Sequence, residues 1–297
     1  MIEKFLEYLQ HEKRFSPHTL QSYSVDLQQF FEFVQKTDDV VGDCNINHLQ
    51  IRGWIVSLLE AGISPRSINR KLSALKSYFK FLRAHGLMTG NPMLKIVAPK
   101  TGKRLPLYVS ESGMEQLKWD EESGHSFRNK RDQCIVELLY GTGIRESELI
   151  QLKISDIDHS ARSIKVMGKG RKERIVPLMP DLYSLLSGYL KLRSFNADIS
   201  SSRHELFLTD KSAIMYPKLV YNIVRRHLNR VTTIEQRSPH VLRHTFATHL
   251  SDNGADIKAV KELLGHASLA ATQVYTHNSI ERLRKVYEQA FPRSDEK

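Results

Sequence analysis

The chain has 297 residues, enough for two domains of ordinary size with substantial cores. Lys and Arg total 44 against 33 Asp and Glu, which gives a net charge of +11 with neutral histidine and points to a polyanionic partner. Hydrophobic residues at 40% and charged residues at 26% exclude a disordered chain and a membrane protein, while Cys44 and Cys134 are too few for a disulfide framework and indicate a reducing compartment.

The amino-terminal part of the chain predicts four helices. Residues 2–12 have the spacing of an amphipathic helix rather than a signal peptide, and no apolar run approaches the roughly 18 residues of a membrane span, so we expect a cytoplasmic protein. Ser16-Pro17 and Ser64-Pro65 each place an N-cap residue before a proline suited to the first helical turn. With a further helix through Leu49–Leu59, residues 1–95 are predicted to form a compact helical domain.

The helix that begins at Pro65 is predicted to have one apolar face and one cationic face. Residues 1–60 contain 5 basic and 9 acidic side chains, whereas residues 61–110 contain 10 basic and no acidic ones. A run of charge is usually a solvated surface, but so long a stretch without a carboxylate favours a surface that lies along a DNA groove. The predicted apolar stripe is Ile68, Leu72, Leu75, Phe79 and Leu82. The predicted DNA-binding residues beside it are Arg66, Arg70, Lys71, Lys76 and Lys80.

Residues 96–106 are predicted to form a basic linker, because Pro, Gly and cationic residues occur there without hydrophobic periodicity. Lys100, Lys103 and Arg104 are the linker residues that we expect to lie along DNA phosphates.

Residues 107–297 are predicted to form a second, mostly helical domain with one β signal. Ile164 and Val166 alternate with polar residues, Gly168-Lys169-Gly170 makes a turn, and Ile175-Val176 begin a return strand. The predicted fold class is therefore mainly α, with a small antiparallel hairpin in the second domain.

Five segments of the second domain carry candidate chemistry. They contain, in order, Arg145, Lys169, the pair His240 and Arg243, His266, and Tyr275. Each alone has a plainer reading: an arginine at a helix start is usually on the surface, a His–Arg cluster can be a hydrogen-bonded part of the core, and a tyrosine usually packs.

Two other kinds of site were weighed against these segments. His240 and His244 have the i, i+4 spacing of zinc enzymes, but the intervening Glu is missing and an arginine beside the ligands would oppose the cation. The glycines around Lys169 do not complete a Walker phosphate loop, because Ser163 stands in place of its first Gly and Gly170 in place of its Ser or Thr.

Taken in order, the five segments resemble the signature of the tyrosine site-specific recombinases of the phage integrase family, and the match extends along nearly the whole chain. In length and layout the chain is most similar to the Xer recombinases of bacterial chromosome-dimer resolution. The resemblance implies a SAM-like core-binding domain of four helices and a catalytic domain, together forming a C-shaped DNA clamp. It also implies that the carboxyl-terminal helix, residues 279–291, is exchanged with a neighbouring protomer; the alternative is that this helix packs on its own domain.

The side chains can be assigned roles in a transesterification like that of type IB topoisomerases. Tyr275 is the candidate nucleophile, and because a phenol has a pKa of about 10, His240 is the candidate general base. Arg145 and Arg243 would bind the non-bridging phosphate oxygens through their planar donors. By analogy with the family, His266 adds a hydrogen bond to the phosphate and Lys169 protonates the leaving 5′ oxygen. No metal and no cofactor is required.

The resemblance further implies a 3′-phosphotyrosyl intermediate, a Holliday junction, and four protomers, identical or of two kinds, on two double-stranded recombination sites. A second Xer-type recombinase and a cell-division DNA translocase are implied partners, and the protein would work at the bacterial nucleoid. Three alternatives remain open at this point: an integrase of a mobile element, a non-catalytic DNA-binding protein of the same fold, and a metal-dependent nuclease.

Overall fold

The computed structural model describes residues 1–37, 46–102, 107–117, 119, 126–168, 172–195, 203–265 and 277–292. The chain divides into two compact units, Met1–Arg104 and Leu105–Lys297. The division falls inside the segment that the sequence marks as a linker. Each unit has a hydrophobic core of its own. No helix in the described part of the chain is both long and apolar enough to cross a membrane.

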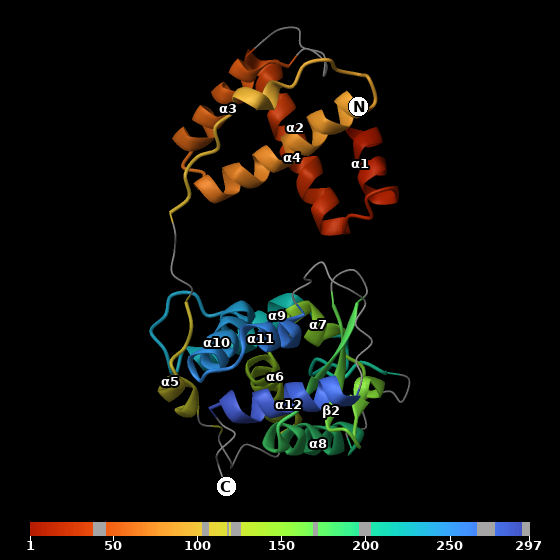
Figure 1. Cartoon of the computed structure of the whole chain (residues 1–297), viewed down its shortest axis with the longest axis vertical. Coiled ribbons are helices and arrows are strands. Elements are labelled where there is room, and N and C mark those ends of the chain that lie inside the picture. The colour runs from red at the N-terminus through yellow and green to blue at the C-terminus, as the bar shows by residue number, and fades with distance from the viewer. Residues whose placement is uncertain are drawn as a thin grey trace. The chain divides into compact units, whose positions relative to one another are not determined.

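In its described residues the first unit has four α-helices and a short 3-10 helix, Pro92–Lys95 (Figure 1). The α-helices are α1 (Ile2–His11), α2 (Pro17–Thr37), α3 (His48–Glu60) and α4 (Pro65–Ala84). The number of helices and the two Ser-Pro starts are as the sequence predicts. The Ser64 hydroxyl accepts a hydrogen bond from the backbone N–H of Ser67 at 3.3 Å, and Pro65 is the first helical residue.

The predicted apolar stripe of α4 forms the centre of the first core. All five of its side chains are at most 5% exposed. Aromatic rings from the other helices surround it, among them Phe5 of α1, which meets Tyr78 edge to face at 5.3 Å, and Phe30 of α2, which meets Trp54 at 5.1 Å. The helical periodicity of α4 therefore identifies which face is buried.

The opposite face of α4 is cationic, with one exception that corrects the sequence prediction. Lys71 is only 7% exposed, and its ammonium group donates to Asp26 Oδ1 at 3.0 Å and to the Gln29 side chain. Asp26 itself is 1% exposed and also accepts two hydrogen bonds from Arg70. Lys71 thus neutralises a buried carboxylate of α2 instead of lying on the surface, because a buried charge needs a paired partner.

The second unit is built from helices and one small sheet (Figure 1). Its α-helices are α5 (Glu111–Glu115), α6 (Phe127–Thr142), α7 (Glu146–Gln151), α8 (Pro180–Phe195), α9 (Pro217–Leu228), α10 (Pro239–Asp252), α11 (Ile257–Leu264) and α12 (His277–Ala290), with a short 3-10 helix at Ile154–Asp156. The strands are β1 (Ile157–Asp158), β2 (Ser163–Met167) and β3 (Glu173–Pro177).

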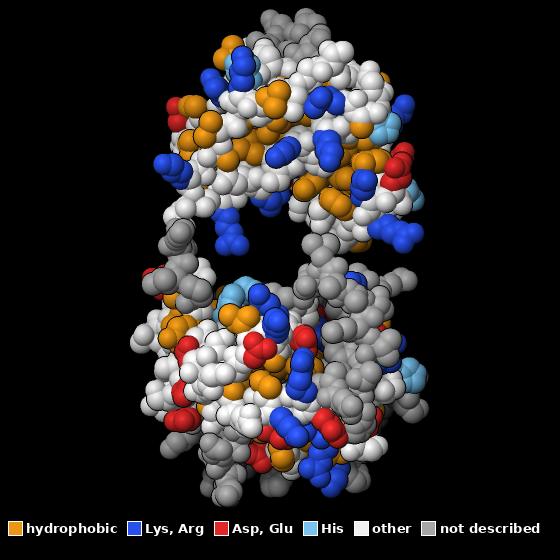
Figure 2. Space-filling model, viewed as in Figure 1, with side chains coloured by type: hydrophobic (Ala, Val, Ile, Leu, Met, Phe, Trp, Pro, Cys, Tyr) orange, Lys and Arg blue, Asp and Glu red, His pale blue; other side chains and the backbone are white. Residues whose placement is uncertain are grey.

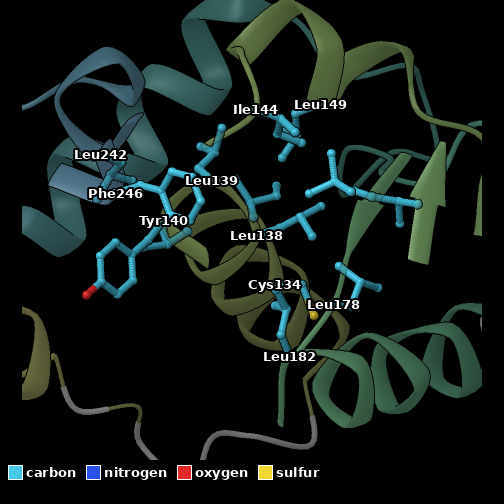
Figure 3. Packing of buried hydrophobic residues seen from close by; sticks show 14 of the residues in the cluster. Cys134, Leu138, Leu139, Tyr140, Ile144, Leu149, Leu178, Leu182, Leu242 and Phe246 are labelled. Carbon is cyan, nitrogen blue, oxygen red and sulfur yellow. The ribbon is translucent and has the colours of Figure 1, made fainter. Parts of the chain in front are cut away.

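Helix α6 runs through the middle of the second unit. In Figure 1, α8 lies on one side of it and α7, α9, α10 and α11 lie on the other. Leu138, Leu139 and Tyr140 are at most 1% exposed, and Figure 3 shows their side chains surrounded by those of neighbouring elements, such as Phe246 of α10. From Arg131 onwards every side chain of α6 is buried or half-buried, so the carboxyl-terminal end of the helix, which leads to Gly143, is held by the core.

Strands β2 and β3 form the predicted hairpin, with Ile164 opposite Val176 and Val166 opposite Arg174. A third strand that the sequence analysis did not identify, β1, pairs antiparallel with β2 and places Ile157 opposite Ile164. It has only two residues, too few to show the alternation that marks a strand.

Helix α12 packs on its own unit in the single chain. Leu283 and Tyr287 are each 1% exposed, Phe291 just beyond the helix is 5% exposed, and the helix contacts α10, α11 and β3. The Tyr287 hydroxyl donates to the carbonyl oxygen of Gly141 at the end of α6. This is the alternative arrangement given above; docking on a neighbouring protomer stays a prediction.

Candidate active site

Arg145 lies at the sharp turn between α6 and α7. The turn is made by Gly143, whose backbone is left-handed with φ of +60°. A Cβ atom at this position would lie 2.4 Å from Cδ1 of the Phe246 ring, so both backbone conformation and space require glycine. The chain then reverses, and Arg145 becomes the N-cap residue of α7.

The carboxylate of Glu148, one turn into α7, fixes Arg145 at two points. Its Oε2 accepts a hydrogen bond from the backbone N–H of Arg145 at 2.8 Å, and its Oε1 accepts one from Nη1 of the same residue at 2.7 Å. The Arg145 side chain is nevertheless 38% exposed, so part of its guanidinium group remains accessible. Glu148 thereby restricts the direction in which an accessible cation points.

Arg243 is the buried counterpart of Arg145 and comes from α10. It is 6% exposed, and it donates to two backbone carbonyl oxygens, from Nη1 to Gly143 at 2.6 Å and from Nη2 to Leu264 at 2.7 Å. One side chain therefore joins the turn before Arg145 to the end of α11, directly before Gly265 and His266 in the sequence. Because both acceptors are neutral, these two hydrogen bonds bring no negative charge to the guanidinium.

Arg145 and Arg243 line the same pocket, with a volume of about 490 Å³. The side chain of His240, one helical turn before Arg243 on α10, borders it as well. The remaining lining residues are Ile144, Glu146, Ser147 and Pro239. The two planar guanidinium groups at this cavity are donors suited to phosphate oxygens, and the imidazole beside them can accept a proton.

His240 and His244 are close to each other, as their spacing suggests, with their Nε2 atoms 3.0 Å apart. This distance is a hydrogen bond in which one imidazole donates and the other accepts. Among the described residues, no three His, Cys, Asp or Glu side chains gather in a way that could hold a metal ion.

The pKa values of the ionisable groups reflect the concentration of charge. Burial, followed by the neighbouring charge of Arg145, lowers the pKa of Arg243 to about 10, so this side chain keeps its charge at neutral pH. Burial alone would raise the pKa of Glu148, but hydrogen bonds and charge from Arg174 and Arg145 outweigh it and lower that pKa below its ordinary value. Burial raises the pKa of Glu146, whose Oε1 has no hydrogen-bond partner among the described residues.

Of the predicted catalytic residues, Arg145, His240 and Arg243 are brought together by the structure. Lys169, His266 and Tyr275 lie outside the described residues, as do Lys103 and Arg104 of the predicted linker. Of the predicted DNA-binding side chains that are described, Lys71 is buried. The others, all exposed, are Arg66, Arg70, Lys76, Lys80 and Lys100.

Glu148 and Arg174 are two further residues of the site that were not predicted from the sequence. Arg174 has the same parity along β3 as the buried Val176, so it is a charged residue at a core-facing position, which needs a buried partner. That partner is Glu148, which stands three residues after Arg145 at the spacing of a helix-capping acid. The sequence therefore shows a charge at a core-facing strand position and an acid at a capping position, and the structure shows that these two residues form an ion pair.

The fold and the pocket together define a mainly helical protein of two units with a cationic site suited to phosphate. Residues 2–86 match the Phage integrase, N-terminal SAM-like domain, and residues 112–282 match the Phage integrase family. The chain is 36% identical to a protein named Tyrosine recombinase XerC from Chlorobaculum parvum, covering 98% of this chain and 94% of that protein. It is 38% identical to the protein of the same name from Oceanobacillus iheyensis, covering 99% and 96%.

Solved structures with the same fold include the XerH site-specific recombinase bound to palindromic difH substrate. That structure has a TM-score of 0.71 and 24% sequence identity to this chain, and the match covers 96% of this chain and 82% of the other. The chain belongs to the phage integrase family and is a site-specific tyrosine recombinase.

Proposed function

We propose that Arg145, His240 and Arg243 form the phosphate-binding side of a site in which Tyr275 attacks double-stranded DNA at a recombination site. The observation that carries this proposal is the convergence of the three side chains on one pocket. In the reaction the phenolic oxygen of Tyr275 bonds to phosphorus, the bond to the 5′ oxygen breaks, and the DNA 3′ end remains on the protein. A 5′ hydroxyl of the partner strand then attacks the phosphorus, the bond to the Tyr275 oxygen breaks, and the exchanged strands form a Holliday junction.

The two arginines suit the transition state of this reaction. Negative charge grows on the non-bridging oxygens as phosphorus becomes five-coordinate, and donors that are already in place stabilise that charge. Arg243 is held by two carbonyl oxygens and Arg145 by Glu148 before any substrate arrives. His240 accepts the phenolic proton. The assignments of His266 as a further phosphate ligand and Lys169 as the acid for the 5′ oxygen rest on the order of the motifs.

The first unit supplies part of the DNA-binding surface in this proposal. The exposed positions of α4 that follow one face of the helix are three or four residues apart. All of them carry a cationic side chain except position 73, which is the polar Ser73. Figure 2 shows many Lys and Arg side chains and few Asp or Glu side chains on the visible face of this unit. The α4 residues of this surface are Arg66, Arg70, Lys76, Lys80 and Arg83. Lys100 is a further exposed cation, and Lys103 and Arg104, which follow it in the sequence, are proposed to contribute as well.

At the level of the cell, we propose resolution of chromosome dimers at cell division, because full-length relatives carry the XerC name. The assembly would be a tetramer on two duplexes, with a second Xer-type recombinase and a DNA translocase as further partners. Such work requires a location in the cytoplasm, at the nucleoid.

The test of the active site is capture of the covalent intermediate. A DNA substrate nicked beside the cleavage position loses its 5′-hydroxyl fragment after cleavage, so a protein–DNA adduct should accumulate and remain on a denaturing gel. Tyr275→Phe should abolish the adduct and leave DNA binding intact, whereas Tyr216→Phe, at a tyrosine that is 53% exposed, should leave both unchanged.

Two results of this experiment would contradict the proposal. An adduct that survives Tyr275→Phe would move the nucleophile to another residue. Salt-sensitive DNA binding by the unaltered chain without any adduct would favour a non-catalytic DNA-binding role, and loss of cleavage in excess chelator would indicate a metal-dependent nuclease.

A further inference from the structure

Arg174 is a buried arginine that the proposed chemistry does not use. It lies on β3 and is 4% exposed. Its guanidinium group forms a two-point pair with Glu148, from Nη1 to Oε1 at 3.1 Å and from Nη2 to Oε2 at 2.7 Å. Since Glu148 also holds both the backbone and the side chain of Arg145, a continuous chain of charged hydrogen bonds runs from β3 to the phosphate pocket.

The same guanidinium contacts two further segments that lead to candidate catalytic residues. Its Nε donates to the carbonyl oxygen of Leu263 at 3.0 Å, at the end of α11. A Cβ atom on Gly265, whose φ is +65°, would lie 3.1 Å from Nη1 of Arg174 and 3.2 Å from its Cζ. A Cβ atom on Gly168 would lie 3.5 Å from the same Nη1. In the sequence, Gly168 directly precedes Lys169 and Gly265 directly precedes His266.

We propose that Arg174 is a positioning residue. Through Glu148 it holds Arg145 in a fixed position relative to Gly168 and Gly265, the residues directly before Lys169 and His266. The inference rests on the function proposed for Arg145, Lys169 and His266. It goes beyond that function because Arg174 itself lines no part of the phosphate pocket. It acts on the reaction only through the groups it holds.

The geometry of the pair explains why the residue is an arginine. A planar guanidinium fixes the plane of a carboxylate through two parallel hydrogen bonds, and Arg174 still has its Nε for the Leu263 carbonyl. A lysine ammonium is a point charge, so it could bind Glu148. It could not also fix the plane of the Glu148 carboxylate and donate to the Leu263 carbonyl at the end of α11. Arg174→Lys should therefore be an intermediate variant and not a silent one.

The charge state of Glu148 offers a readout specific to this role. Among the described residues, three guanidinium groups act on Glu148: Arg145 from its own helix, Arg174 from β3 and Arg243 from α10. Hydrogen bonds and charge from Arg174 are the largest of the contributions that lower its pKa against the effect of burial. Without Arg174, burial should raise that pKa towards neutral, and protonated Glu148 would lose its ion pair with Arg145.

The experiment measures the rate of adduct formation by the full-length protein on the nicked substrate, from pH 5.5 to 8.5, for Arg174→Met, Arg174→Lys and the unaltered chain. At pH 7, Arg174→Met should cleave about 10²-fold more slowly, the effect of a misplaced catalytic group. The ratio of its rate to that of the unaltered chain should fall further as the pH falls, by up to about tenfold per pH unit. Arg174→Lys should lose about tenfold at pH 7.

Arg131→Met is the matched control. Arg131 is 1% exposed and is also a buried arginine paired with a carboxylate: its Nε and Nη2 both donate to Oδ1 of Asp132, at 2.9 Å and 2.7 Å, on α6 outside the phosphate pocket. It should lower the stability of the fold without making the rate ratio depend on pH. Adding Glu148→Gln to Arg174→Met should remove the pH dependence, because the titrating group is gone.

The proposal is overturned if Arg174→Lys cleaves as fast as the unaltered chain at every pH. It is also overturned if folded Arg174→Met protein shows the flat rate ratio of Arg131→Met. Should Arg174→Met fail to fold, Arg174→Lys alone decides. Failure of the proposed active site would be recognised separately, because Tyr275→Phe would then still form the adduct.

Discussion

Replacement of Arg243 by lysine should give an enzyme that loses activity as the pH rises. Arg243 is 6% exposed, and burial together with the charge of Arg145 lowers its pKa well below its ordinary value, to about 10. A lysine begins from a pKa of about 10.4, so a comparable lowering in this environment would bring its pKa to about 8. The positive charge would then be present below about pH 8 and lost above it.

The magnitude of the effect has a constant part and a pH-dependent part. At pH 7 lysine remains charged, but one ammonium replaces a fork that donates to the carbonyl oxygens of Gly143 and Leu264 while facing the pocket. Loss of one donor to a developing oxyanion slows catalysis by about 10²-fold or more. Above about pH 8, the remaining rate should fall by a further tenfold for each pH unit, because only the protonated fraction stabilises the phosphate.

The assay is adduct formation on the nicked substrate between pH 6.5 and 9.5, expressed as the rate of the variant divided by that of the unaltered chain. The ratio cancels the titration of every group that the two proteins share, including the nucleophile. Arg128→Lys is the control: it lies on α6 outside the pocket, its side chain is 54% exposed, and its partner is Asp210. Its ratio should be flat and close to one.

A ratio for Arg243→Lys that stays constant or rises from pH 7 to 9.5 would refute the reasoning. It would mean either that the site is more hydrated than its burial indicates or that the charge at position 243 does not act on the phosphate. Folding of the variant at each pH, followed by circular dichroism, separates these outcomes from alkaline unfolding.

Two further predictions concern the stability of the turn before Arg145 and the DNA-binding surface. Gly143→Ala should lower the free energy of unfolding by about 2–5 kcal/mol, because left-handed backbone strain and an overpacked contact with Phe246 add together. Gly254→Ala, with φ of +84° and no atom within 4 Å, should lower it only by the backbone strain, about 1–2 kcal/mol. Equal losses of stability in denaturant unfolding would contradict the contact at Gly143. Lys76→Gln with Lys80→Gln should reduce the slope of log affinity for DNA against log salt concentration by about 1.8, whereas Lys71→Met should leave that slope unchanged, as titrations at several salt concentrations will show.

The sequence identifies features of the fold that depend on neighbours along the chain. Ser64 and Pro65 start α4 because a cap and a fixed φ act within one helical turn. The hairpin of β2 and β3 follows from alternation on both sides of a glycine turn. The buried face of α4 follows from the 3.6-residue period.

Features that depend on pairing between distant segments were not predictable in the same way. Lys71 follows a residue of the cationic face and precedes a residue of the apolar face, and its burial is decided by Asp26, 45 positions earlier on another helix. The pair of Arg174 with Glu148 spans 26 positions and joins a strand to a helix. In both cases the sequence shows a charge but not the opposite charge that accompanies it into the interior.

The same pairing bears on how much positive charge lines the proposed phosphate pocket, because Glu148 lies between Arg174 and Arg145. Glu148 is paired with both Arg174 and Arg145, and among the described residues Arg145 and Arg243 are the cationic side chains that line the pocket. Arg243→Lys and Arg174→Met change different parts of this group of charges. Loss of the cation at position 243 should make cleavage fail at high pH, and loss of the guanidinium at position 174 should make it fail at low pH, because the first removes a pocket charge and the second exposes a carboxylate to protonation. If both variants changed in the same direction with pH, the division between a structural ion pair and two catalytic cations would be wrong.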